Sequence, residues 1–68
     1  MKLYRVMEMI KKMERHGEVT SWVVVDESGN IIYTENDEVY DMDTELLVKS
    51  IEDGCWIRYG AQIAIIIY

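Results

Sequence analysis

Apolar side chains recur every three or four residues in the first segment of the chain, which is the spacing of one face of an α-helix. The stripe consists of Leu3, Val6, Met7, Ile10 and Met13. Basic residues gather towards residue 16, where the negative end of a helix dipole favours them, and Gly17 is the residue type that commonly ends a helix. The pattern therefore predicts an α-helix over residues 2–17.

Residues 18–35 are rich in β-branched and aromatic residues, and the stretch DESGN divides them into two arms. Asp26 suits the first position of a type I turn, and Gly29 suits the left-handed position that follows, so the segment predicts a β-hairpin. The register that follows from this turn pairs Val25 with Ile31, Val24 with Ile32 and Val23 with Tyr33. One face should then carry Trp22, Val24 and Ile32, and the other Val23, Val25, Ile31 and Tyr33.

The stretch ENDEVYDMD (35–43) reads as a loop, and a second, shorter helix is expected over residues 44–53. Asp43 is a suitable N-cap, Met42 and Leu47 stand at the positions of a hydrophobic staple, and Gly54 would end the helix. The expected buried edge of this helix is Leu47, Val48 and Ile51. Residues 8–17 and 45–54 also share a pattern, offset by 37 positions, which allows an internal duplication.

Residues 55–68 contain a second alternating segment, which one long strand or a second hairpin would accommodate. We expect the hairpin, because Gly60 suits the first position of a type II′ turn and fourteen residues exceed the usual strand length. Tyr59 and Gln62 would flank the Gly60–Ala61 turn. Ile63, Ile65 and Ile67 should point to one layer, and Ile66 with Tyr68 to the other.

Together these elements predict a single α+β domain over residues 1–68, with the order αββαββ. The expected architecture has two layers, a four-stranded antiparallel sheet and two helices on one of its faces. Both faces of such a sheet would carry apolar side chains, so the second face needs a cover, which a homodimer or a target protein would supply.

Charge is distributed unevenly along the chain, whose net value is −6. Residues 1–16 carry five cations and two acids (+3), whereas residues 17–68 carry two cations and eleven acids (−9). The negative balance disfavours direct nucleic-acid binding and favours a basic partner. A single cysteine, no secretory signal and no uncharged run near the ~20 residues of a membrane helix lead us to expect a cytoplasmic protein, in the host cytoplasm if phage-encoded.

Candidate chemistry is sparse, and we expect no catalytic residue, no metal and no cofactor. Asp41, Asp43, Glu45 and Glu52 match the acidic positions of an EF-hand loop, but Leu46 stands where that loop requires glycine. Cys55 and His16 have ordinary structural explanations, as a small apolar strand residue and as a cation at a helix end. A basic helix face could touch nucleic acid, but the rest of the chain repels it.

The acidic loop is the feature with functional weight, because tyrosines lie in it and beside it and tyrosine is favoured at interfaces. The expected partner-binding residues are Glu35, Asp37, Glu38, Tyr40, Asp41, Asp43 and Glu45. We therefore expect a non-enzymatic interaction module: a small acidic inhibitor or adaptor of the phage or mobile-element type, which presents carboxylates to a basic nucleic-acid-handling protein. A homo-oligomeric module that uses an apolar sheet face is the alternative.

The stretch VVVDESGNIIYTEN (23–36) resembles the opening hairpin of PAS-type sensor domains, with its valine-rich strand, Asp, turn Gly, apolar strand and Asn. The resemblance covers fourteen of the 68 residues. PAS domains are longer, at about a hundred residues, and carry several helices before their closing strands. We interpret the match as a consequence of the residue types that hairpin turns require. A small PAS-like sensor fragment remains a further alternative.

Overall fold

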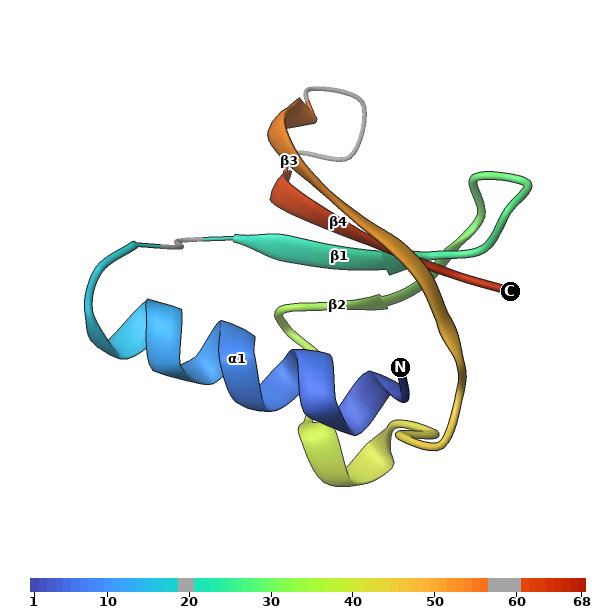
Figure 1. Cartoon of the computed structure of the whole chain (residues 1–68), viewed down its shortest axis with the longest axis horizontal. Coiled ribbons are helices and arrows are strands. Elements are labelled where there is room, and N and C mark those ends of the chain that lie inside the picture. Colours follow the sequence, from blue (N-terminus) through green and yellow to red (C-terminus); the bar gives the residue numbers. More distant parts are fainter. Residues whose placement is uncertain (19–20, 57–60) are drawn as a thin grey trace.

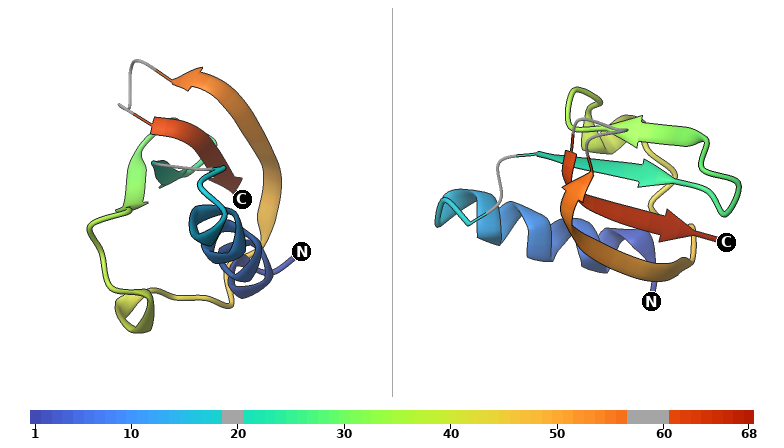
Figure 2. Two further views of the ribbon diagram at one scale, coloured as in Figure 1. Left: turned by 90° about the vertical axis from the view of Figure 1, so that its left-hand side faces the viewer. Right: turned by 90° about the horizontal axis from the view of Figure 1, so that it is seen from above.

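The computed structural model describes residues 1–18, 21–56 and 61–68, which form one helix, one short 3₁₀ turn and a four-stranded sheet. The elements are α1 (Leu3–Arg15), β1 (Trp22–Val25), β2 (Ile31–Thr34), η1 (Val39–Asp41), β3 (Val48–Trp56) and β4 (Ala61–Ile67). Helix α1 lies against one face of the sheet, and η1 lies on the same side (Figures 1 and 2). The α+β class is confirmed.

Helix α1 confirms the first prediction, because the apolar stripe is the face that enters the core. Leu3, Val6, Met7 and Ile10 are buried. The helix ends as expected: Gly17 has φ +72, a value that residues with a Cβ rarely adopt. The Glu18 N–H donates to the Met13 carbonyl at 2.9 Å. This bond provides a partner for one of the last carbonyls of the helix, which have none within the helix itself.

The sheet has the strand order β2-β1-β4-β3 and is mixed, so the prediction of an antiparallel-only sheet is wrong. Two antiparallel hairpins, β1–β2 and β3–β4, meet through β1 and β4, which run parallel. Strands β2 and β3 must then run in the same direction, and this needs a crossover of a dozen or more residues. Residues 35–47, thirteen positions between Thr34 and Val48, supply it on the helix side of the sheet (Figure 1).

The turn of the first hairpin is as predicted, but its register is only partly so. Gly29 has φ +87. The Asp26 carboxylate accepts the N–H groups of Ser28 and Asn30, each at 2.9 Å, and these bonds lower its pKa, with those from Asn30 contributing most. Val25 pairs with Ile31 as expected.

A β-bulge beyond that pair makes the other two predicted pairings wrong, because Val24 faces Tyr33 and Val23 faces Thr34. The extra residue moves Tyr33 to the helix face, where it packs against the core, instead of the face predicted for it.

The second predicted helix is wrong, because residues 48–56 form strand β3. Asp43 does begin a single turn, in which its carboxylate accepts the Glu45 N–H at 3.2 Å, but the chain then straightens. Of the expected helix edge, Val48 is buried, whereas Leu47 and Ile51 are exposed. Gly54 lies inside the strand instead of ending a helix. An internal duplication would require an α-helix in both halves, and the described residues of the second half contain only the 3₁₀ turn η1.

The last segment forms a hairpin arm paired with β3, as expected. The prediction of a Gly60–Ala61 turn is wrong for Ala61, which belongs to β4 and pairs with Trp56. Tyr59 and Gly60 lie outside the described residues. Ile63, Ile65 and Ile67 lie on one face and Ile66 on the other, as predicted, and the structure shows that the first set belongs to the larger core cluster next to α1. Tyr68 is exposed.

Core side chains lie on both faces of the two central strands. The larger cluster lies between the sheet and α1. On the other face Val23, Val25 and Ala64 form a smaller buried cluster, with Ile66 beside it. The two faces were expected from the sequence to be apolar, and both carry buried apolar side chains on the central strands β1 and β4.

Candidate functional site

The acidic segment 35–45 makes up most of the crossover between the two hairpins, and hydrogen bonds to the backbone fix its first turn. The Asp37 carboxylate accepts the Thr34 N–H at 2.8 Å, and the Asp37 N–H donates to the Thr34 carbonyl at 3.0 Å. The Asn36 N–H donates to the Thr34 hydroxyl at 3.3 Å. Asp37 is therefore occupied in holding the turn that follows β2.

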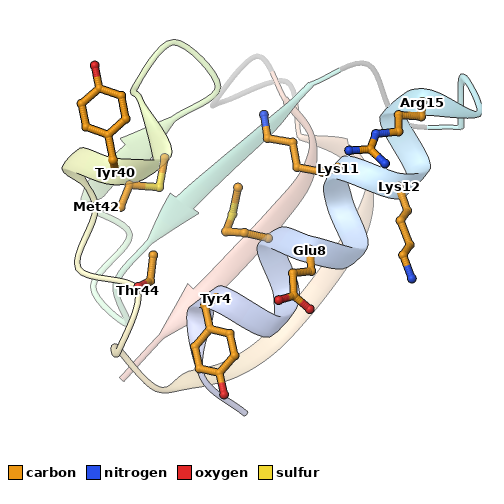
Figure 3. A pocket seen from close by; sticks show the side chains of 9 residues that line it. Tyr4, Glu8, Lys11, Lys12, Arg15, Tyr40, Met42 and Thr44 are labelled. Atoms are coloured by element: carbon orange, nitrogen blue, oxygen red, sulfur yellow. The ribbon is translucent and has the colours of Figure 1, made fainter.

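The middle of the crossover is the 3₁₀ turn η1, which is tied to the core at its far end. The Asp41 N–H donates to the Glu38 carbonyl at 3.0 Å, and Met42 is buried in the main core. The Tyr33 hydroxyl accepts the Asp43 N–H at 2.8 Å, so the end of β2 holds the end of the turn. Tyr40, between these anchors, is 83% exposed, and its ring points away from the helix (Figure 3).

The end of the crossover is joined to the start of α1. The Leu3 and Tyr4 N–H groups donate to the carbonyls of Leu46 and Thr44, at 2.8 and 3.0 Å. Lys2 Nζ lies 2.6 Å from Glu45 Oε2, and this hydrogen bond, with the attraction of the two charges, raises the pKa of Lys2. Carbonyls of the crossover thus cap the helix in place of a side chain.

The seven predicted partner-binding residues therefore divide into two sets. Asp37, Asp43 and Glu45 hold the crossover or pair with Lys2. The others are exposed, and their side chains make no hydrogen bond or ion pair within the part of the chain that the structure describes. These residues, which we call the loop surface, are Glu35, Glu38, Tyr40 and Asp41.

A cleft of about 620 Å³ separates α1 from the crossover, and sequence reasoning did not find it. Figure 3 shows the side chains that line it, which come from two segments far apart in the sequence. The lining residues are Tyr4, Met7, Glu8, Lys11, Lys12 and Arg15 on the helix and Tyr40, Met42 and Thr44 on the crossover. The helical spacing of Lys11 and Arg15 was visible in the sequence, but the opposing wall depends on the crossover.

The cleft has an apolar floor and a basic wall. Met7 and Met42 are both buried and approach from opposite sides. The wall formed by α1 contains three cations and one carboxylate. Lys11 makes a long ion pair of 3.9 Å with Glu14, whereas Lys12 and Arg15 make none among the described residues. Part of the basic helix face is thus neutralised by the protein's own acids.

Residues arranged for catalysis or metal binding are sparse in the described part of the chain. His16 is exposed at the end of α1. The Cys55 side chain lies outside what the structure describes. Within the described residues there is no group of three or more His, Cys, Asp or Glu side chains arranged to hold a metal ion. No helix among those residues is long and apolar enough to cross a membrane.

Comparison of the chain with protein-family models, with curated proteins and with solved structures finds no match.

Proposed function

We propose that the protein is a non-enzymatic interaction module, a small acidic inhibitor or adaptor whose loop surface binds a basic, nucleic-acid-handling protein. The observation that carries the proposal is Tyr40, which is 83% exposed on an anchored turn between Glu38 and Asp41. Tyrosine contributes disproportionately to the binding energy of interfaces. A fixed turn also reduces the entropy that binding must remove, because its backbone is already ordered.

Charge gives the partner its expected character. The chain has a net charge of −6, and three of the four loop-surface residues are carboxylates that form no ion pair with any other described residue. Such a surface attracts a basic protein and accelerates the encounter at low ionic strength. A protein that grips phosphates presents the matching cations, so carboxylates at phosphate-like positions would compete with its nucleic acid.

The first experiment is affinity capture from extracts of the source cells, with the wild-type chain and matched variants as baits. The test variant is Glu35→Gln/Glu38→Gln/Asp41→Asn. The control is Glu8→Gln/Glu18→Gln/Glu52→Gln, which changes the net charge by the same amount at exposed positions outside the crossover. We expect a basic protein to be captured by the wild type and by the control, and to be lost with the test variant.

The captured protein is then purified and its affinity measured directly. We expect Tyr40→Ala to weaken binding about tenfold or more, since interface tyrosines often act as hot spots. Binding should weaken as salt rises from 50 to 500 mM, and a short nucleic-acid duplex should displace the chain. An affinity that changes neither with salt nor in the Glu35→Gln/Glu38→Gln/Asp41→Asn variant would contradict the proposal. Equal losses in test and control variants would also do so, because net charge alone would then explain binding.

A homo-oligomeric module is the second candidate, favoured by the apolar edge of the sheet. Strand β2 lies at that edge, carries no charge, and exposes Ile31 and Ile32. Unpaired strands of this kind can pair with a second copy. Light scattering at high concentration tests the idea: a dimer that Ile31→Lys converts to a monomer supports it, and a monomeric wild type removes it.

A further inference from the structure

The cleft between α1 and the crossover has the dimensions of a site for one small molecule. Its volume of about 620 Å³ falls within the ~300–1,000 Å³ that ligand pockets usually occupy. The floor is formed by Met7 and Met42, whose unbranched side chains adapt to apolar surfaces of different shapes. An occupant therefore needs an apolar body that replaces water above these two thioethers.

The cations of the basic wall favour an occupant with a negative charge. Figure 3 shows the ends of Lys11 and Arg15 at one end of the cleft and the Glu8 carboxylate at the Tyr4 end. The separation means that an anion near Lys11 and Arg15 is not placed against Glu8. Glu14, which lies 3.9 Å from Lys11, is the other carboxylate at this end. It also accepts the indole N–H of Trp22 at 3.2 Å, so part of its charge is already engaged.

The acidic residues of the crossover do not line the cleft, so they do not repel an anion at the end that contains Lys11 and Arg15. Glu35, Glu38 and Asp41 are exposed, and none of them is among the residues that line it. The crossover contributes Tyr40, Met42 and Thr44, which are uncharged. Attraction at this site is therefore local, because the chain as a whole, at −6, repels anions.

We propose that the cleft binds a small organic acid, with an apolar body over Met7 and Met42 and one carboxylate next to Lys11 and Arg15. Arginine favours carboxylates because its planar guanidinium donates two parallel hydrogen bonds. The proposal does not depend on the loop surface binding a protein, although Tyr40 belongs to the loop surface and also lines the cleft.

The experiment uses the chain's own methionines as reporters. Protein carrying ¹³C-labelled methionine methyl groups is titrated with octanoate, octanol and octylammonium, which share one apolar body and differ in charge. We expect octanoate to shift the Met7 and Met42 methyl signals most, and to bind roughly fivefold or more tightly than octanol, as two partly exposed ion pairs allow. Octylammonium should bind more weakly than octanol. Met9, which is not among the residues that line the cleft and is exposed, is the internal control.

The variant Lys11→Gln/Arg15→Gln tests the basic wall. It should remove the preference for octanoate over octanol, because the cations next to the carboxylate are lost while the apolar floor of Met7 and Met42 remains. Lys49→Gln, an exposed lysine on β3, is the control for general charge and should keep the preference. The proposal is overturned if the three probes bind equally, if octanoate does not bind, or if the largest shifts appear at Met9 or Met13.

Discussion

Residues 8–17 and 45–54 share a ten-residue pattern of Glu, two apolar positions, Lys and a final Gly, yet they fold differently. The first lies in α1 and its cap, and the second is largely strand β3. The aligned apolar positions also have different environments: Ile10 is 2% exposed and Leu47 is 55% exposed. A short amphipathic pattern therefore specifies an apolar edge, but it does not specify the secondary structure that presents this edge.

Two physical differences separate the segments. The first has Met, Lys, Glu and Arg around its single β-branched residue, and all four are good helix formers. The second has Val48, Ser50 and Ile51, which favour a helix less. Strand β4 also needs a partner on its second edge, and residues 48–56 provide it. A helix of ten residues is marginal by itself, so the pairing decides the outcome.

The largest expected effect is the unequal response of the two aligned apolar positions. Ile10→Ala should lower the free energy of unfolding by about 2–5 kcal/mol, because it leaves a cavity beneath α1. Leu47→Ala should lower it by less than about 1 kcal/mol, because this side chain is mostly in water.

Urea unfolding followed by tryptophan fluorescence measures both changes. Ile10→Val, expected to destabilise the fold by about 0.5–1.5 kcal/mol, keeps the comparison measurable if the alanine variant does not fold. Equal effects at positions 10 and 47 would contradict the burial that we describe.

The end of the first segment provides the next test. Gly17→Ala should destabilise the protein by about 1 kcal/mol, because φ is +72 and a Cβ strains the left-handed conformation. Open space surrounds the added methyl group, so strain is the expected cause and not collision. Gly17→Asn should be milder, since asparagine tolerates this conformation. Thermal unfolding ranks the three proteins, and an alanine variant as stable as wild type would argue against a left-handed cap.

Placing threonine, which favours strands over helices, at the aligned and exposed positions 15 and 52 should change the free energy of unfolding in opposite directions. Arg15→Thr removes a good helix former and a cation near the negative end of the helix dipole, and should destabilise by roughly 0.5–1 kcal/mol. Glu52→Thr places a β-branched residue in β3 and should stabilise by up to about 0.5 kcal/mol. Denaturant midpoints of both variants provide the readout, and destabilisation by Glu52→Thr would count against a strand at this position.

The smallest effect concerns Lys49, whose pKa is raised above its ordinary value of 10.5 by a hydrogen bond to Glu27 and then by the attraction of its charge. Because the folded-state pKa is raised, the resulting stability is fully present below the ordinary pKa and is lost as the pH rises through the folded-state value. Glu27→Gln should move the NMR titration of Lys49 back towards 10.5. An unchanged titration would mean that β3 does not hold Lys49 against the hairpin turn.

The candidate site was partly visible in the sequence. Acidity and interleaved tyrosines identified the crossover, but they did not distinguish Glu35, Glu38 and Asp41 from Asp37 and Asp43. That distinction depends on which carboxylates accept backbone N–H groups, and the bonds exist only once the turn has formed. The cleft was not visible, because Met7 and Met42 are thirty-five positions apart and meet only when the crossover passes α1.

The sequence by itself determined the features that depend on neighbours along the chain. These are the extent of α1 and its buried stripe, the Gly17 cap, the turn held by Asp26 and Gly29, and the alternation of Ile63 to Ile67 between two layers. Each follows from backbone periodicity or from the φ that one residue can adopt.

Tertiary structure alone decided the strand state of residues 48–56, the parallel β1–β4 pair and the bulge that turned Tyr33 towards the core. These features satisfy hydrogen bonds and bury surfaces between segments distant in the chain. Local propensity is too weak to fix such contacts: it amounts to a few tenths of a kcal/mol per residue, whereas a buried side chain contributes about 2 kcal/mol.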